Sequence, residues 1–400
     1  MDHSLAQEVH AWIADDPDPT TAAQLQQWLD AGNESELRAS FNGFLQFGTA
    51  GLRGPIRPGP SGMNRAVVGR AASGIVVYMK ERNLTSVVIG RDARYGSEDF
   101  TFETAEIMSG AGMKVYVLPR PLPTPVLAFA TNELKCDVGI MVTASHNPPQ
   151  DNGYKVYLGG TVDGIHYRGS QIVSPTDEAI AAKIDAVTSL KSQPRGKVWE
   201  VLGEEIIEKY IARTASLATN PGSLRLVYTA MHGVGTETIQ RVFQKAGFQS
   251  PIPVQAQAAP DPDFPTVAFP NPEEPGAIDL ALETARSFDA HLVIANDPDA
   301  DRCAAAVIDP VTGWRMLRGD ELGAIFAESI ARKIDSGIFA NSIVSSSIVK
   351  KIADHYNLHF KETLTGFKWL AKIENLTFGY EEALGYSVDS VTVNDKDGIS

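Results

Sequence analysis

The sequence predicts an α/β protein of three consecutive domains that follow an N-terminal helical extension. Short apolar runs of strand length alternate with longer segments of helical periodicity along most of the chain. A length of 400 residues exceeds what one hydrophobic core usually serves, and a prior of roughly 100–200 residues per domain implies two or three domains. Three of the apolar runs end in polar loops, so we expect three strand-end loops to carry the chemistry.

The first forty residues are expected to form two helices. Two apolar stripes with helical spacing flank a break at residues 15–20, namely Leu5, Val9, Trp12 and Ile13, then Leu25, Trp28 and Leu29. Because each stripe is short, the two helices are predicted to pack together as an extension of the first domain.

The alternating pattern then places the main elements and the domain boundaries. Strands are expected at residues 86–90, 114–118, 137–142, 224–228, 291–295 and 376–380, and helices at 67–79, 204–217 and 319–330. A linker at 192–196 and the turn at Thr312-Gly313 suggest domains at 1–200, 201–318 and 319–400. The proline cluster at 257–275 is expected to be an extended loop.

Composition excludes several functional classes. The formal net charge of −14 argues against a general nucleic-acid binder, which needs a basic face. No apolar run approaches the ~18 residues of a membrane span, and the first residues lack a secretory pattern. The two cysteines, Cys136 and Cys303, lie in apolar strand-like surroundings and are expected to be core residues in a reducing cytoplasm.

The segment 296–302 carries three alternating carboxylates, Asp297, Asp299 and Asp301, beside Arg302. An EF-hand loop would need glycine and glutamate where this chain has Arg302 and Ile308, and an apolar strand precedes the segment. The aspartates are therefore predicted to bind a small, hard cation, with magnesium as the first choice. The alternative is a solvated acidic turn, which would leave Arg302 without a role.

The segment 143–155 offers a nucleophile, Ser145, with His146 beside it and Lys155 shortly after. Serine is a weak nucleophile, so covalent catalysis needs a base, a metal or both. If Ser145 is carried as a phosphoserine, its oxygens can add a ligand to the metal at the three aspartates. Taken alone, each of these residues is more often an ordinary turn or surface residue.

Two glycine-rich segments are weaker signals. Residues 47–54 end in Arg53 and suit the close approach of backbone to an anion. Residues 232–235, His-Gly-Val-Gly, resemble a dinucleotide motif, but Thr238 stands at its third glycine position. We therefore reject a nicotinamide cofactor and expect His232 to support a loop.

Taken together, these motifs resemble the α-D-phosphohexomutase superfamily, especially its phosphoglucomutase and phosphopentomutase branch. The matching segments stand in family order at residues 47–54, 143–155, 296–302, 365–368, 379–385 and 396–399. The resemblance implies α/β domains with mixed sheets around a shared cleft. It also implies a cytoplasmic isomerase that interconverts 1-phospho and 6-phospho sugars through a bisphosphorylated intermediate, with glucose as the first substrate.

The resemblance also implies roles for individual residues. Ser145 would be the phosphorylated residue and would bind Mg²⁺ together with Asp297, Asp299 and Asp301. Lys155 or His146 would lie near the proton transfers. The expected contacts to the sugar phosphate come from Arg53, Arg302, Thr365, Gly366, Lys368, Glu381, Glu382 and Lys396. Glucose 1,6-bisphosphate would serve as activator and intermediate, and small sugar phosphates would be the ligands, with no nucleic acid or membrane as partner and the oligomeric state left open.

Two of these roles carry a physical expectation. A lysine serves as a base only if its pKa is lowered, and we expect Arg53 and Arg302 to lower the pKa of Lys155. The carboxylate of Glu381 can accept two sugar hydroxyls, which would distinguish ring orientations.

The chain departs from the family pattern in two ways. Ala383 follows the glutamate pair where many relatives have serine, so one hydrogen bond to the sugar is absent. Whether the substrate is a hexose or a pentose phosphate therefore stays open. The sequence also stops at Ser400, before the family's fourth domain, and we expect part of the last apolar sheet face to be exposed. Phosphopentomutase, phosphomannomutase, a phosphatase and a truncated sugar-phosphate binder therefore remain as alternatives.

Overall fold

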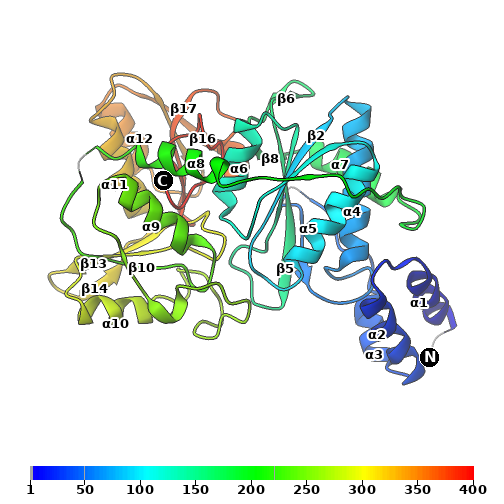
Figure 1. Ribbon diagram of the computed structural model, residues 1–400. Coiled ribbons are helices and arrows are strands. Elements are labelled where there is room, and N and C mark those ends of the chain that lie inside the picture. Colours follow the sequence, from blue (N-terminus) through cyan, green and yellow to red (C-terminus); the bar gives the residue numbers. More distant parts are fainter. Residues whose placement is uncertain (1–2, 49, 220) are drawn as a thin grey trace.

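Three separate β-sheets, each covered by helices, organise the chain (Figure 1). The computed structural model describes residues 3–48, 50–219 and 221–400. The sheets follow one another in the sequence and mix parallel with antiparallel strands, so the predicted class of three α/β domains with mixed sheets is confirmed.

The N-terminal extension contains three helices where two were predicted. They are α1 (His3–Asp15), α2 (Pro19–Asp30) and α3 (Glu34–Ser40). The third was missed because seven residues are too few to display a periodic stripe. Leu5, Val9, Leu25 and Leu37 form a small core of their own. The Asp15 carboxylate ties this unit to the first domain by accepting hydrogen bonds from Ser189 Oγ at 2.6 Å and Leu190 N at 2.7 Å.

The first sheet has the strand order β1-β5-β4-β2-β3-β9, with β8 beside β5. Its strands are β1 (Leu52–Pro55), β2 (Ser86–Arg91), β3 (Lys114–Val117), β4 (Val138–Val142), β5 (Asp151–Leu158), β8 (Ser170–Gln171) and β9 (Glu200–Val201). Its helices are α4 (Arg65–Glu81), α5 (Ser97–Gly110), α6 (Thr124–Glu133) and α7 (Thr176–Asp185), and β6 (Thr161–Val162) and β7 (Ile165–His166) form a separate hairpin.

The predicted strands β2, β3 and β4 are confirmed. β5 was not expected, and it returns antiparallel to β4 with Lys155 opposite Met141.

The second sheet has the order β11-β10-β12-β13-β14. Its strands are β10 (Leu226–Thr229), β11 (Ile252–Pro253), β12 (Leu292–Ala295), β13 (Ala304–Asp309) and β14 (Gly313–Met316), accompanied by α8 (Glu205–Ala215), α9 (Gly235–Lys245), α10 (Asp279–Ser287) and the 3₁₀ turn η1 (Gln255–Gln257). The turn at Thr312-Gly313 leads from β13 into β14, so it lies inside the sheet and does not separate two domains.

The third sheet has the order β16-β15-β17-β18. Its elements are β15 (Ile338–Ser342), β16 (His359–Thr363), β17 (Leu376–Glu381) and β18 (Gly385–Ser387), with α11 (Gly319–Ala331), α12 (Ile348–His355) and α13 (Phe367–Leu370). The prediction of an exposed apolar sheet face is wrong for the strand side chains Phe339, Phe378, Tyr380 and Tyr386, which are all buried. Helices α11, α12 and α13 contact these strands.

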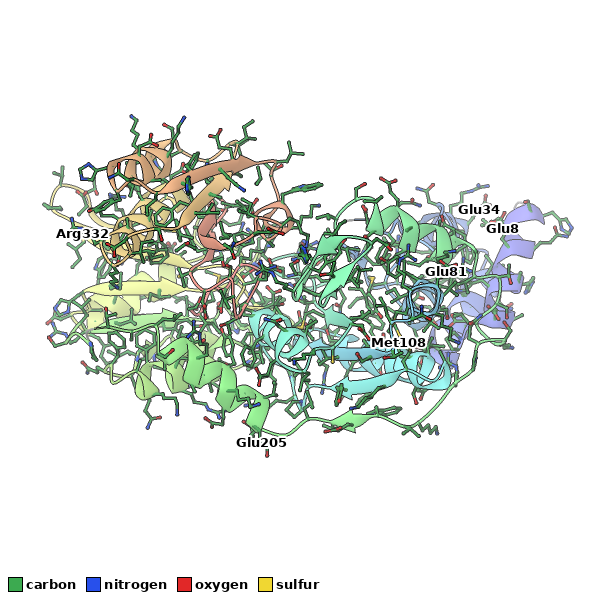
Figure 2. The ribbon with its side chains drawn as sticks, turned by 90° about the horizontal axis from the view of Figure 1, so that it is seen from above. Glu8, Glu34, Glu81, Met108, Glu205 and Arg332 are labelled. Carbon is green, nitrogen blue, oxygen red and sulfur yellow. The ribbon has the colours of Figure 1, made fainter. Side chains whose placement is uncertain are left out.

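Shared cores hold the three domains together. One cluster joins Val126 of α6 to Ile207 of α8 and Tyr228 of β10, and so links the first domain to the second. Another joins Val293 of β12 to Leu322 of α11 and Phe339 of β15, and so links the second to the third. Figure 2, turned by 90°, shows Glu8 and Glu34 of the extension at one end and Arg332 at the other.

In the part of the chain that the structure describes, no helix combines the length and apolar character of a membrane span.

Candidate active site

Ser145 follows the carboxyl end of β4 and reaches the second domain. Its backbone adopts a left-handed conformation, with φ of 52°, and its N–H donates to Thr143 Oγ1 at 2.9 Å. Only 2% of the residue is exposed. Ser145 Oγ donates a hydrogen bond to Asp297 Oδ2 at 2.7 Å, across 152 positions of the sequence. The folded chain thus joins the serine and aspartate loops, as the sequence predicted.

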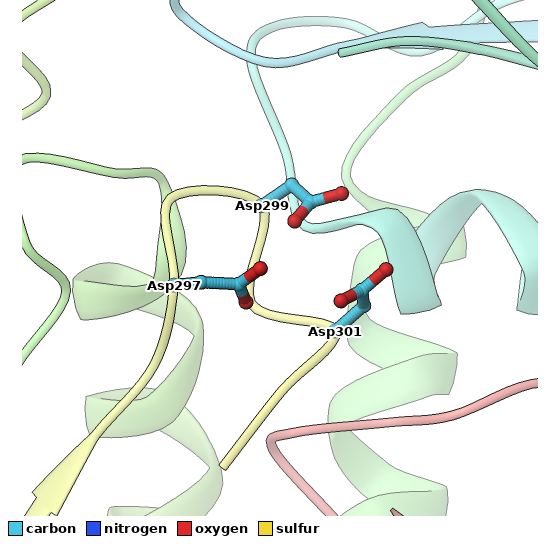
Figure 3. A group of neighbouring side chains, drawn as sticks. All are labelled: Asp297, Asp299 and Asp301. Carbon is cyan, nitrogen blue, oxygen red and sulfur yellow. The ribbon is translucent and has the colours of Figure 1, made fainter. Parts of the chain in front are cut away.

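The three aspartates follow β12 and point toward one another (Figure 3). One carboxylate oxygen from each of Asp297, Asp299 and Asp301 lies within 4.8 Å of the others, and all three residues are fully buried. Asp299 Oδ1 has no hydrogen-bond partner within the described ranges. A buried set of convergent oxygens with one acceptor unpaired fits a hard divalent cation such as Mg²⁺.

The three carboxyl groups differ in their proton affinity. Burial, reinforced by the charges of Asp299 and Asp301, raises the pKa of Asp297 to about 7. Burial also acts to raise the pKa of Asp301, but the ammonium groups of Lys155 and Lys396 outweigh it and hold that pKa well below its usual range. Asp297, which is nearest to Ser145, is therefore the member of the triad that binds a proton most readily.

Lys155 lies in β5 and crosses to the second domain. Its Nζ donates to Asp299 Oδ2 at 2.7 Å and to Asp301 Oδ2 at 2.8 Å. Burial favours a lower pKa for Lys155, but the two carboxylates raise it above its ordinary value. The expectation that the pKa of Lys155 is lowered is therefore wrong: Arg53 acts to lower it, but the two aspartates that contact the ammonium directly outweigh that effect. Lys155 is a charged counterion in this structure.

His146 stands beside the serine hydroxyl, with its Nδ1 at 3.3 Å from Ser145 Oγ. Burial, together with the positive charges of Arg302, Lys396 and Arg53, lowers the pKa of His146 to about 3. The imidazole is consequently neutral near pH 7.

Three cations surround this cluster. Arg53 Nη1 donates to Asn147 Oδ1 at 3.1 Å, and Lys396 Nζ donates to Asp301 Oδ1 at 2.8 Å. The Nε atoms of Arg53 and Arg302 are buried and have no hydrogen-bond partner among the described residues. Unpaired guanidinium N–H groups next to a nucleophile suit the oxygens of a phosphate. Thr49, in the same glycine-rich segment as Arg53, lies outside the described residues.

The third loop is built around the end of β17. Glu381 Oε1 accepts a hydrogen bond from Gly366 N at 2.5 Å, and burial raises the pKa of Glu381. Glu382 Oε2 instead accepts from Ser342 Oγ at 2.9 Å and Ser345 Oγ at 2.7 Å. Two hydroxyl groups of its own domain therefore hold the Glu382 carboxylate, whereas Glu381 Oε1 is held by a single backbone amide.

The remaining predicted contacts flank this loop. Thr365 is exposed and Gly366 and Lys368 are partly buried, and burial lowers the pKa of Lys368. Lys396, by contrast, contacts the aspartate loop directly through its hydrogen bond to Asp301 Oδ1. The main-chain hydrogen bond from Cys303 N to Leu384 O, 3.0 Å long, joins the sugar-loop segment to the aspartate segment.

Several supporting residues were not identified from the sequence. Thr124, at the start of α6, donates to Asp299 Oδ2 at 2.6 Å, and Arg94 donates to main-chain carbonyls of the Ser145 loop. The position of Arg94, just after β2, was a usable signal because that strand ends at the same sheet edge as β4. No comparable signal in the sequence pointed to Thr124, because its hydrogen bond to Asp299 depends on how the first and second domains pack together.

His232 has the supporting place expected for it. Its ring accepts or donates a hydrogen bond with Thr266 Oγ1 at 2.8 Å, and burial lowers the pKa of His232. The next residue, Gly233, lies against Pro298, where an added Cβ would come within 2.2 Å of the proline Cα. The segment therefore packs under the aspartate loop.

Comparisons with known proteins show which family the chain resembles. Models of the phosphoglucomutase/phosphomannomutase alpha/beta/alpha domains I, II and III match residues 45–191, 207–309 and 318–400. The chain is 50% identical over 345 residues to a probable phosphomannomutase of Haemophilus influenzae, covering 85% of this chain and 70% of that protein. It is 37% identical to a phosphoribomutase of Saccharomyces cerevisiae, covering 99% of this chain and 70% of that protein.

Among solved structures, the fold resembles a phosphoglucomutase/phosphomannomutase family protein from Burkholderia thailandensis. The TM-score is 0.75 at 21% sequence identity, with 88% of this chain and 74% of the other covered.

Proposed function

Because the chain belongs to the phosphoglucomutase/phosphomannomutase family, we propose that it is a magnesium-dependent phosphosugar mutase that works through a phosphorylated Ser145. The observation that carries the proposal is the 2.7 Å hydrogen bond from Ser145 Oγ to Asp297 Oδ2. It brings the candidate nucleophile to the candidate metal ligands. A phosphoryl group on Ser145 would add its oxygens to theirs.

The proposed metal ligands are Asp297, Asp299, Asp301 and the phosphoryl group on Ser145. Bound there, Mg²⁺ would neutralise the negative charge that accumulates on the phosphoryl oxygens during transfer. The Nε–H groups of Arg53 and Arg302, which have no partner among the described residues, are available to bind the same oxygens.

In the proposed reaction, a sugar hydroxyl attacks the phosphorus on Ser145. The bond between Ser145 Oγ and phosphorus breaks, a bond from phosphorus to the sugar oxygen forms, the sugar hydroxyl loses its proton and Ser145 Oγ gains one. We propose that His146 passes this proton to Ser145 Oγ, because its ring lies 3.3 Å from that oxygen. In the reverse transfer the same proton returns. Lys155 keeps its charge and balances Asp299 and Asp301.

The sugar is proposed to bind at the third loop. Glu381 is the better candidate of the glutamate pair, since the Glu382 carboxylate already accepts two serine hydroxyls. We propose glucose 1-phosphate and glucose 6-phosphate as the first substrate pair, with glucose 1,6-bisphosphate as activator. A pentose phosphate is the second candidate, favoured by the relative named phosphoribomutase and by Ala383, whose methyl group offers no hydrogen bond to a hexose hydroxyl. Mannose phosphate, named for the Haemophilus relative, is a third.

Incubating the chain with Mg²⁺ and glucose 1,6-bisphosphate labelled in both phosphates tests the proposal. We expect label on Ser145 and none on the Ser145→Ala variant. Comparison of kcat/KM for glucose 1-phosphate, ribose 1-phosphate and mannose 1-phosphate then ranks the sugars. Free phosphate in place of isomerised sugar would identify a phosphatase, and sugar-phosphate binding by folded but unlabelled protein would identify a binder.

The location that we propose is the cytoplasm. Cys136 and Cys303 are both free thiols, which suits a reducing compartment.

A further inference from the structure

Arg94 gathers the main-chain carbonyls of the Ser145 loop around one guanidinium group. Its Nη2 donates to Ser145 O at 2.7 Å and to Asn147 O at 2.6 Å. Its Nη1 donates to Pro148 O at 2.8 Å and to Asp151 O at 3.2 Å. The side chain is 1% exposed, so it does not face the solvent or a substrate. All of its terminal N–H groups thus serve to shape one loop.

The loop needs such support at Ser145 itself. A φ of 52° is left-handed, and a residue with a Cβ adopts this conformation at a cost of roughly 1–2 kcal/mol. The Ser145 carbonyl is one of the four that Arg94 binds. The guanidinium therefore opposes relaxation of the backbone that carries the nucleophile.

Arg94 is itself held from both sides. Asp92 Oδ2 lies 3.4 Å from Arg94 Nε, and Asp92 Oδ1 accepts from Arg94 N at 3.0 Å and from Ser97 Oγ at 2.6 Å. On the other side, the guanidinium carbon lies 4.8 Å from the centre of the Phe264 ring, which belongs to the second domain.

The next residue makes a second contact between the same two segments. Tyr95 OH donates to Asp263 Oδ1 at 3.1 Å. The segment 92–97 therefore touches the serine loop of the first domain and the 261–264 loop of the second at once.

We propose that Arg94 is a positioning residue that holds the Ser145 loop in place against the second domain, which carries the aspartate loop, by clamping four carbonyls and stacking on Phe264. The inference rests on the proposed function for its catalytic consequence, but the clamp itself is a property of the fold. A lysine cannot replace it, because an ammonium group has three donors at one point and lacks the planar fork of arginine.

The proposal predicts a specific kinetic pattern. Displacement of a reacting group by about 1 Å costs about 100-fold in rate, so Arg94→Lys should lower kcat by roughly 10- to 100-fold. KM for the sugar phosphate should stay within about twofold, because Arg94 does not contact the substrate site. Phe264→Leu, which keeps the four carbonyl contacts, should lower kcat by only about two- to fivefold.

The matched control is Arg91→Lys. Arg91 lies three positions earlier and pairs with Glu98 at 3.0 Å. This change should leave kcat and KM unaltered.

The closing experiment combines labelling of Ser145 by labelled glucose 1,6-bisphosphate with hydrogen exchange of the segment 143–153 in the full chain. We expect Arg94→Lys to slow labelling and to speed amide exchange of this segment at least tenfold, while Arg91→Lys changes neither. Unchanged exchange in Arg94→Lys would overturn the inference, whether or not the wild-type chain accepts label. Absence of label on wild type would refute the proposed function alone. If Arg94→Lys fails to fold, the Phe264→Leu variant tests the proposal instead. The proposal requires amide exchange of the segment 143–153 to be faster in this variant than in the wild type.

Discussion

The Nζ of Lys155 lies 2.7 Å from Asp299 Oδ2 and 2.8 Å from Asp301 Oδ2, although the lysine and the aspartates belong to different domains. The lysine comes from β5 of the first sheet, and the aspartates follow β12 of the second. All three side chains are at most 5% exposed. The ammonium group therefore balances buried charge at the seam between the domains.

This relationship predicts the effect of removing the lysine charge. Lys155→Met leaves Asp299 and Asp301 without their shared partner, and loss of one member of a buried pair costs about 3–5 kcal/mol. We expect a lower Tm in the presence of EDTA, partly restored by Mg²⁺, which can supply the missing positive charge. Lys209→Met is the control, since Lys209 pairs with Glu133 on the surface and is 61% exposed. Equal Tm values for the two variants would contradict the account.

Two aspartates of the triad should respond in opposite directions when changed to asparagine. The folded-state pKa of Asp297, about 7, lies above its unfolded value, so Asp297 lowers stability increasingly as the pH rises from about 4 to 7. Metal-free Asp297→Asn should match or exceed the Tm of the wild type at pH 7, with the difference vanishing near pH 4.

The pKa of Asp301 is lowered on folding, so its stabilising effect is present at neutral pH and is lost only in acid. Asp301→Asn should therefore lower the Tm at pH 7, because Lys155 and Lys396 both lose a partner. Both variants should lose Mg²⁺ affinity in calorimetric titration. A fall in Tm for Asp297→Asn at pH 7 as large as for Asp301→Asn would show that the assigned charge states are wrong.

His146 should remain neutral throughout the physiological pH range. Burial and three neighbouring cations lower the pKa of His146 to about 3, so its ring should not titrate between about pH 5 and 8. NMR spectra of the imidazole protons, assigned by comparison with His146→Gln, can measure this. A midpoint near the ordinary histidine value of about 6.5 would refute the prediction, because it would show that burial and the neighbouring cations do not act on the ring as described.

The two adjacent glutamates should have separable effects. Glu381→Gln should raise KM for the sugar phosphate about tenfold with little change in Tm, since one charge-assisted hydrogen bond contributes about 1.5–3 kcal/mol. Glu382→Gln should lower stability by about 1–2 kcal/mol, because its carboxylate accepts hydrogen bonds from Ser342 and Ser345. Steady-state kinetics and thermal unfolding of both variants decide the matter. A larger KM effect for Glu382→Gln would reverse the assignment.

The elements that could be predicted are those whose residues carry their own pattern. The strands β2, β4 and β12 are short apolar runs between turn residues, and the helix α11 shows a clear apolar stripe, so each was located within a few residues. The short α3 and the strand β5 were missed. β5 follows the serine loop directly, and it begins with the polar residues Asp151-Asn152-Gly153, which are not typical of a strand. In the structure it pairs with β1 on one edge and with β4 on the other.

The sequence by itself determined the chemical groups of the candidate site, because Ser145, the three aspartates and the arginines stand in motifs whose residue types and spacing are specific. Only the tertiary structure decided which of these groups are charged and which other residues hold them in place. The pKa of Lys155 depends on carboxylates 144 and 146 positions away, and the Ser145 loop is shaped by Arg94, 51 positions before it. Electrostatic interactions and hydrogen bonds act over a few ångströms of space, and the separation along the chain does not enter into them.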